Sequence, residues 1–218
     1  MKEPVFFVVE GPEASGKSTF ILRLFRYLNK EFRNEIIITR EPGSPLSEAC
    51  SLCRKMMLDP NSKLCKESEI FLFGLDRTNH FKDVIRPNLS NNKNIISDRC
   101  YDSTVAYQGY GRNDGDPDYL LFLKEFNKQA TLNTVPDITF FLMVDPEVGM
   151  KRLTIEEFGE KDHFEKEKID FHQKVYDGYM EIYNKEKDDR NIILLDTTSI
   201  SPDEVWEKAK EKLISILY

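Results

Sequence analysis

Five short apolar runs recur along the chain and predict buried β-strands. They are rich in Val, Ile and Phe, and most of their positions do not alternate with polar residues. Such a pattern is typical of strands that are covered on both faces of a sheet. The five runs are Val5–Val9, Ile36–Thr39, Asn94–Ser97, Ile138–Val144 and Asn191–Leu195.

Helical patterns separate these runs. Apolar residues recur at intervals of three and four in Ser18–Phe32, Tyr119–Ala130 and Trp206–Leu217, which places them on one face of an α-helix. Strands that alternate with helices favour parallel β-α units in one doubly wound sheet. The 218 residues contain no repeat and no linker. We therefore expect a single α/β domain over residues 1–218, with a five-stranded parallel sheet and helices on both faces.

The overall charge narrows the classes of partner. Lys and Arg number 31 and Asp and Glu number 38, which gives a net charge of −7. This acidic balance argues against binding to a nucleic-acid polymer or to an anionic membrane surface. No apolar run approaches the ~20 residues that span a bilayer, and the first residues lack the long apolar stretch of a secretory signal. We expect a cytoplasmic protein without a membrane partner.

Four cysteines raise the question of a metal or redox site. Cys50 and Cys53 have C-x-x-C spacing, but Cys65 and Cys100 do not form the second close pair that a four-ligand zinc site usually needs. The first pair lies in a helical pattern, Leu46–Leu58, where positions three apart are neighbours. Reduced thiols packed in a helix are therefore the favoured interpretation, and a metal or redox role is the alternative.

Residues 11–18 match the phosphate-binding pattern G-x-x-x-x-G-K-[ST]. A predicted strand runs into this P-loop and a predicted helix follows it, which aims backbone N–H groups at phosphates. Lys17 adds a charge for the β- and γ-phosphates, and the Ser18 hydroxyl reaches Mg²⁺. We expect a P-loop NTPase fold in which ATP contacts Gly11, Pro12, Glu13, Ala14, Ser15, Gly16, Lys17, Ser18 and Thr19.

Further motifs separate the classes of protein that share a P-loop. They are T-R-E-P-G at 39–43, F-G-L-D-R at 73–77, D-R-C-Y-D-S-T-V-A-Y-Q-G-Y-G-R at 98–112 and P-D-I-T-F at 136–140. In this order and spacing the blocks resemble the bacterial thymidylate kinases over nearly the whole chain. The resemblance implies transfer of the γ-phosphoryl group of ATP to dTMP, giving dTDP and ADP with Mg²⁺, in dTTP synthesis. It also implies a homodimer.

Three polar residues are candidates for the phosphate end of the acceptor site. Arg77 and Arg99 suit an acceptor phosphate because a planar guanidinium group binds two phosphate oxygens at once, and the resemblance implies this role for both. For Arg99, an ion pair with Asp98 is the structural alternative. Asp98 ends a predicted strand, where an acid biases Mg²⁺, through water.

The resemblance also implies which residues recognise the base. Phe73 would stack on thymine, although core packing is the favoured reading of a lone helical Phe. Thr104 and Gln108 would read the N3–O4 edge of thymine, and Arg54 would approach O4.

The sugar contacts are implied in the same way. Tyr107 would pack beneath the sugar, where a 2′-hydroxyl is crowded. Glu13 would lie near the 3′-hydroxyl and the phosphates. Glu41 and Pro42 would line the same pocket.

The segment 154–165 is where the sequence departs from the family. Bacterial relatives usually carry arginines there that reach over the transferred phosphoryl group, whereas this segment has Lys161 and His163 and no Arg. We expect a mobile lid, with Lys161 or Arg152 supplying the missing charge. The alternative for Arg152 is stacking on adenine, as its family counterpart does. Asp162 and Glu165 match acids near Mg²⁺, or form a solvated charged face.

The acceptor phosphate is already an anion, so no general base is needed. Lys17 and Arg99, with the lid cation, are therefore the predicted catalytic residues. Another deoxynucleoside monophosphate kinase or a deoxynucleoside kinase of similar fold is the alternative. A nucleoside acceptor carries no phosphate for Arg77 and Arg99. A GTPase needs an N-K-x-D motif, which the sequence lacks.

Overall fold

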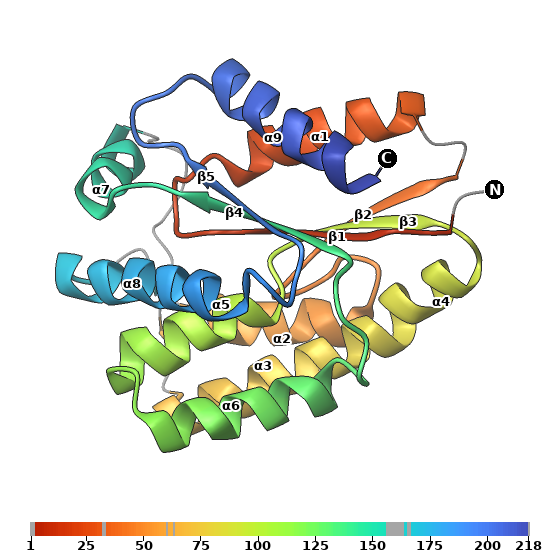
Figure 1. Cartoon of the computed structure of the whole chain (residues 1–218). Helices are drawn as coiled ribbons and strands as arrows, with labels where there is room; N and C mark the ends of the chain where they lie inside the picture. Colours follow the sequence, from red (N-terminus) through yellow and green to blue (C-terminus); the bar gives the residue numbers. More distant parts are fainter. Residues whose placement is uncertain are drawn as a thin grey trace.

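Five parallel strands form one central sheet in the computed structural model (Figure 1). The structure describes residues 3–31, 34–59, 61–62, 64–155, 164 and 167–217. Across the sheet the strand order is β2-β3-β1-β4-β5. The five predicted strands are confirmed to within one residue at each end: β1 (Phe6–Glu10), β2 (Ile36–Arg40), β3 (Asn94–Asp98), β4 (Ile138–Met143) and β5 (Ile192–Asp196).

Helices cover both faces of this sheet, as the sequence predicts. On one face lie α1 (Lys17–Glu31) and α9 (Pro202–Leu217). On the other lie α2 (Glu48–Leu58), α3 (Lys66–His80), α6 (Pro117–Ala130) and α8 (Ile169–Glu186) (Figure 1). The shorter helices are η1 (Phe81–Ile85), α4 (Arg86–Ser90), α5 (Tyr101–Thr104), η2 (Val105–Gly111) and α7 (Pro146–Ile155). Among the described helices, none is long and apolar enough to cross a membrane.

Alternation along β1 divides the core between the two faces. Phe7 and Val9 pack with residues of α1 and α9 in one buried cluster. Phe6 and Val8 pack on the opposite face with Phe81 of η1. Both sides of the strand are therefore excluded from water, which explains why its sequence is continuously apolar.

Parallel pairing brings three loops to the same edge of the sheet. β3 lies between β2 and β1, and Asp98 at the end of β3 is in register with Arg40 of β2 and Val9 of β1. The P-loop after β1 therefore lies beside the segments that follow β2 and β3. Ligands of open α/β sheets bind at this carboxyl edge, where the strand order reverses.

The C-x-x-C pair lies on α2, as predicted, and its two thiols are buried. The Cys50 thiol donates a hydrogen bond to the carbonyl oxygen of Asp76 at 3.3 Å. Burial raises the pKa of Cys50 to about 12, so its thiol stays protonated. No group of three or more possible metal-ligating side chains is found within the described ranges.

Candidate active site

The P-loop has the backbone geometry that a phosphate cradle requires. Gly11 and Gly16 adopt positive φ angles of 141° and 89°, and a Cβ on Gly11 would lie 2.1 Å from the Leu142 carbonyl oxygen. Ala14, a residue with a side chain, also takes a positive φ of 53°. The loop thus accepts a side chain at this position in a conformation that favours glycine.

The Lys17 side chain points back onto the preceding residues of the P-loop. Its Nζ donates hydrogen bonds to the carbonyl oxygens of Pro12 at 2.7 Å and Gly11 at 3.2 Å. Burial, followed by the nearby charge of Arg99, lowers the pKa of Lys17 to about 8. The ammonium group is therefore held at the mouth of the P-loop, where phosphate oxygens would meet it.

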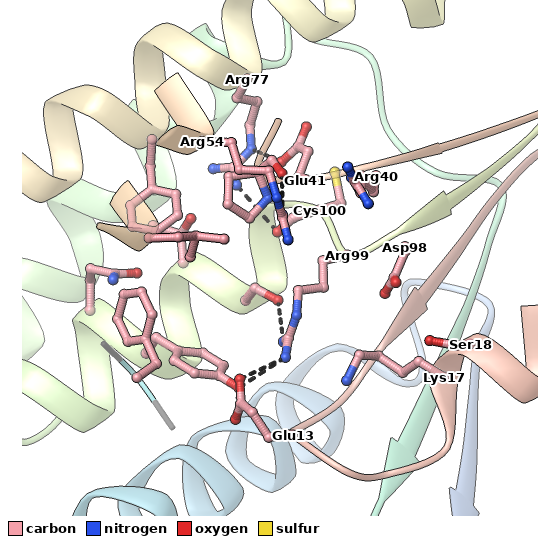
Figure 2. Close-up of a pocket in the computed structure, with 18 of the residues that line it drawn as sticks. Glu13, Lys17, Ser18, Arg40, Glu41, Arg54, Arg77, Asp98, Arg99 and Cys100 are labelled. Carbon is pink, nitrogen blue, oxygen red and sulfur yellow. Dashed lines mark hydrogen bonds and ion pairs between the residues drawn. The ribbon is translucent and has the colours of Figure 1, made fainter. Parts of the chain in front are cut away.

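A cavity of about 390 Å³ opens beside the P-loop (Figure 2). It is formed by the P-loop, the ends of β2 and β3, and helices α2, α3, α5 and η2. The structure brings together here all residues predicted for the acceptor and for Mg²⁺: Glu13, Ser18, Glu41, Pro42, Arg54, Phe73, Arg77, Asp98, Arg99, Thr104, Tyr107 and Gln108.

Arg99 occupies the centre of this cavity, between Lys17 and the pair Arg54 and Arg77 (Figure 2). Its Nη2 donates to Glu13 Oε1 at 2.9 Å and to the Tyr107 hydroxyl at 3.1 Å. The sequence left an ion pair with Asp98 open, but the carboxylate that the guanidinium contacts is Glu13.

Glu13 joins the P-loop to the acceptor pocket. Its second oxygen accepts a hydrogen bond from the Tyr107 hydroxyl. Burial alone would raise the pKa of Glu13, but the charges of Arg99 and Lys17 outweigh it and hold the pKa below its ordinary value. Glu13 is thus an anion at neutral pH that fixes both Arg99 and Tyr107.

Arg77 belongs to a buried ion network at the other end of the cavity. Its Nε donates to Glu41 Oε2 at 2.8 Å, and its two Nη atoms donate to Asn127 and to the Cys100 carbonyl oxygen. His80 Nδ1 lies 2.9 Å from the other oxygen of Glu41. A guanidinium group has five N–H donors, so two of them remain for a ligand.

Three cavity residues carry buried polar atoms that have no hydrogen-bond partner within the described structure. They are Thr104 Oγ1, Gln108 Nε2 and Asp98 Oδ1. A buried polar group without a partner costs about 1–3 kcal/mol, and such groups in native proteins call for an explanation. Donors and acceptors supplied by a bound molecule would satisfy all three.

Asp98 and Ser18 form a donor set that fits Mg²⁺. The two oxygen-bearing side chains face the same part of the cavity beside Lys17 (Figure 2). Mg²⁺ is commonly held by one or two protein oxygens together with substrate phosphates and water. The unpartnered Asp98 oxygen is therefore consistent with a cation site next to the P-loop.

Arg152 lies at a different cavity from the acceptor residues. This second cavity, of about 290 Å³, is lined by Ser15, Gly16, Thr19, Leu142 and Thr197 among others. The Arg152 guanidinium donates to the carbonyl oxygens of Ala14, Thr197 and Thr198. This position on the outer side of the P-loop favours contact with the donor nucleotide over contact with the transferred group.

Most of the predicted lid lies outside the described residues. This applies to Lys161, Asp162, His163 and Glu165, so the predicted catalytic role of Lys161 stays a prediction. Phe164 is described and lines the acceptor cavity. Its ring centroid lies 5.7 Å from that of Tyr107 and 6.4 Å from that of Phe73.

Sequence reasoning missed several residues of the site. Arg40 and Ser103 line the cavity, although only their motifs were noted. Glu10 and Tyr179 do not line the cavity, but both form hydrogen bonds with the Ser103 hydroxyl group. A Glu in an otherwise apolar strand was a visible signal for Glu10, whereas nothing in the pattern of α8 distinguished Tyr179.

The fold and the two cavities define a class of protein. A P-loop at the carboxyl edge of a parallel sheet separates a donor cavity from an acceptor cavity that contains several arginines. This is the arrangement of a P-loop phosphotransferase with a small phosphorylated acceptor.

Comparison with known proteins identifies the family. A family model described as thymidylate kinase matches residues 9–208. The thymidylate kinase of Oleidesulfovibrio alaskensis is 38% identical and covers 97% of this chain and 98% of its own. The thymidylate kinase of Carboxydothermus hydrogenoformans is 40% identical and covers 81% of this chain and 83% of its own. The solved thymidylate kinase of Ehrlichia chaffeensis superposes with a TM-score of 0.73 at 27% identity, covering both chains fully. The chain belongs to the thymidylate kinase family.

Proposed function

We propose that the chain transfers the γ-phosphoryl group of ATP to dTMP, giving dTDP and ADP, in dTTP synthesis. The observation that carries this proposal is the acceptor cavity, which is lined by the unpartnered Thr104 Oγ1 and Gln108 Nε2 and by Arg99, whose guanidinium group contacts Glu13 of the P-loop. Membership of the thymidylate kinase family supports the same reaction.

The donor nucleotide binds at the P-loop. Backbone N–H groups of the loop and of the first turn of α1 bind the phosphates of ATP, and Lys17 neutralises the β- and γ-phosphates. Arg152 lines the second cavity, where the adenine base would bind beside it. Mg²⁺, held by Ser18, Asp98 and the ATP phosphates, would neutralise charge on the transferred group.

The acceptor cavity binds dTMP by its base and its phosphate. Thr104 and Gln108 supply hydrogen bonds to the thymine edge, and Phe73 supplies a ring for stacking. Tyr107 is fixed by Glu13 beneath the sugar, which disfavours a 2′-hydroxyl. Arg77 and Arg99 supply donors for the phosphate end, which points toward the P-loop, and Arg54 would approach O4 of the base.

Catalysis then consists of positioning and charge neutralisation. The dTMP phosphate oxygen that attacks is an anion near neutral pH, so no side chain needs to remove a proton. Arg99 and Lys17 lie near each other in the cavity (Figure 2), so the donor and acceptor phosphates would meet between them. Cations there stabilise the negative charge that spreads over the transferred group. A deoxynucleoside acceptor is not favoured, because it would leave the arginines without a phosphate.

The substrate assignment is tested by ADP release with dTMP, dUMP, dGMP and UMP as acceptors. We expect the highest kcat/KM with dTMP. Greater activity with any of the other three acceptors would refute the assignment.

The role of Lys17 is tested in the same assay. The Lys17→Ala variant should lose about a hundredfold or more in kcat, because it removes a preorganised charge at the reacting phosphates. Lys30→Ala, which changes an exposed lysine in the last turn of the same helix, should leave kcat unchanged. Equal effects of both substitutions would exclude the proposed role of Lys17.

We further propose that two copies of the chain form a homodimer through helices α2, α3 and α6. These helices lie side by side on one face of the sheet (Figure 1). They expose large apolar side chains at neighbouring positions: Leu52, Met56, Phe71, Leu75, Leu121 and Phe122. Exposed apolar side chains grouped on one face commonly mark an interface between proteins.

A further inference from the structure

Arg99 is held by a group of buried residues that lie behind the acceptor cavity. Glu10 ends β1 and Tyr179 lies on α8, and both side chains are fully buried. Neither lines the cavity, so neither is placed to touch a substrate. Ser103 contacts Glu10, Tyr179 and Arg99, and it does line the cavity.

Hydrogen bonds connect these groups to the Arg99 guanidinium. Arg99 Nη1 donates to Ser103 Oγ at 3.1 Å and to the Tyr179 hydroxyl at 3.2 Å. Ser103 Oγ in turn donates to Glu10 Oε2, and the Tyr179 hydroxyl donates to the same oxygen at 2.9 Å. Both hydrogens of Nη1 are therefore directed by two hydroxyl groups that share one carboxylate.

The chemistry of these groups fixes the direction of the two bonds from Arg99. A guanidinium group can only donate, so both hydroxyls must accept from Arg99. Each hydroxyl then has one proton left, which the ionised form of Glu10 accepts at Oε2; the two hydroxyl oxygens also lie 2.9 Å apart. A donor group at position 10 would leave each hydroxyl between that donor and the N–H groups of Arg99.

Glu10 also fixes the backbone directly after Arg99. Arg99 has a φ of 69°, in the left-handed region that is costly for a residue with a side chain. Glu10 Oε1 accepts the backbone N–H groups of Cys100 at 2.7 Å and Ser103 at 3.2 Å. It thereby supplies the acceptor for the first turn of α5, which its own N-cap residue does not supply.

We propose that Glu10 and Tyr179 are positioning residues that aim Arg99 at the junction of the acceptor phosphate and the P-loop. Glu10 fixes the backbone of the arginine, and the two residues together fix its Nη1 group. This inference rests on the proposed function, which places the reacting phosphates next to Arg99. It adds two residues from β1 and α8 that do not touch the substrates.

The first test is kinetic and uses Tyr179→Phe, which removes one hydroxyl and keeps the ring. We expect kcat with dTMP to fall about tenfold, the size expected for losing one hydrogen bond to a charged group. The KM for ATP should stay within about twofold, because the P-loop is unchanged. An unchanged kcat in this variant would overturn the proposal.

Tyr183→Phe is the matched control. Tyr183 lies one turn further along α8, and its hydroxyl makes no hydrogen bond in the described part of the chain. We expect its kinetics to match those of the wild type. A similar loss of kcat in both variants would show a general effect on the helix and would count against positioning.

The second test combines Tyr179→Phe with Glu10→Gln. The amide that Glu10→Gln introduces would present N–H donors to the hydroxyls, so this substitution alone should also lower kcat. Because both residues act through the same Arg99 group, the double variant should be scarcely slower than the slower single variant. Losses that multiply independently would overturn the shared action.

The third test does not depend on activity. The NMR signals of the Arg99 side chain, assigned with Arg99→Lys, report its Nη hydrogens in the substrate-free protein. We expect hydrogen exchange at Arg99 to quicken in Tyr179→Phe and to stay unchanged in Tyr183→Phe. Inactivity of the wild type toward dTMP would refute the proposed function, whereas unchanged Arg99 exchange in Tyr179→Phe would refute the positioning.

Discussion

Individual residues at this site have backbone conformations or surroundings that are unfavourable in isolation. Ala14 and Arg99 both have positive φ angles, and Glu10 is a carboxyl group without exposure to water. Such positions persist only where the surrounding structure fixes them, and they concentrate at functional sites. The cost of each position is offset by hydrogen bonds to its neighbours.

Glu10 should leave a measurable trace in the pH dependence of stability. Burial, followed by the charge of Asp102, raises its pKa from 4.5 to about 7. The folded state therefore binds this proton more tightly than the unfolded state. The contribution of Glu10 to the free energy of unfolding is fully present below about pH 4.5 and is lost as the pH rises through 7.

Urea unfolding of the wild type and of Glu10→Gln across this range measures the contribution. Relative to the variant, which does not titrate at position 10, the wild type should gain ~3 kcal/mol between about pH 8 and about pH 4.5. The difference between the two proteins removes the contribution of the other carboxyl groups. A pH-independent difference would show that the pKa of Glu10 is not raised.

At the scale of elements, close approach between α8 and η2 sets the position of Tyr179. Gly178 precedes this tyrosine, and a Cβ on it would lie 2.9 Å from Cβ of Tyr110. On η2, a Cβ on Gly111 would lie 2.6 Å from the Phe171 ring. Glycines on both elements thus allow a distance that larger residues would prevent.

Gly178→Ala should therefore destabilise the protein although Ala is the better helix former. Helix propensity alone would favour Ala by about 1 kcal/mol, while overpacking against Tyr110 costs about 1–3 kcal/mol. We expect a net loss of about 1 kcal/mol in urea unfolding and a lower kcat. Asp177→Ala, at a neighbouring position that is not buried, should change stability by about 0.5 kcal/mol or less. A variant more stable than the wild type would contradict the close approach.

At the scale of the whole molecule, the two faces of the sheet differ in what they offer to partners. The face of α1 and α9 is next to the donor cavity. The opposite face ends in α2, α3 and α6, whose exposed apolar side chains include Phe71, which is 65% exposed, and Leu121, which is 62% exposed. This asymmetry supports a dimer that leaves the donor cavity open.

Phe71→Glu should separate the dimer into single chains, because it places a charge in an apolar interface. Sedimentation equilibrium of the wild type should give about twice the chain mass of 25.5 kDa, and the variant should give one chain mass. Leu22→Glu is the control, since Leu22 is similarly exposed on α1 of the opposite face. A monomeric wild type, or an equal effect of both changes, would exclude this interface.

Sequence alone was enough to establish the strands, the P-loop, the family and most of the residues that line the acceptor cavity. These follow from local pattern and from motifs whose spacing is fixed by the loops that carry them. Which of these residues touch depends on the folded chain. Placing β1 beside β3 brings Glu10 to the backbone of Cys100, 90 residues away, and the packing of α8 brings Tyr179 to Glu10 across 169 residues. Contacts at such separations depend on strand order and helix packing, and no local periodicity encodes them.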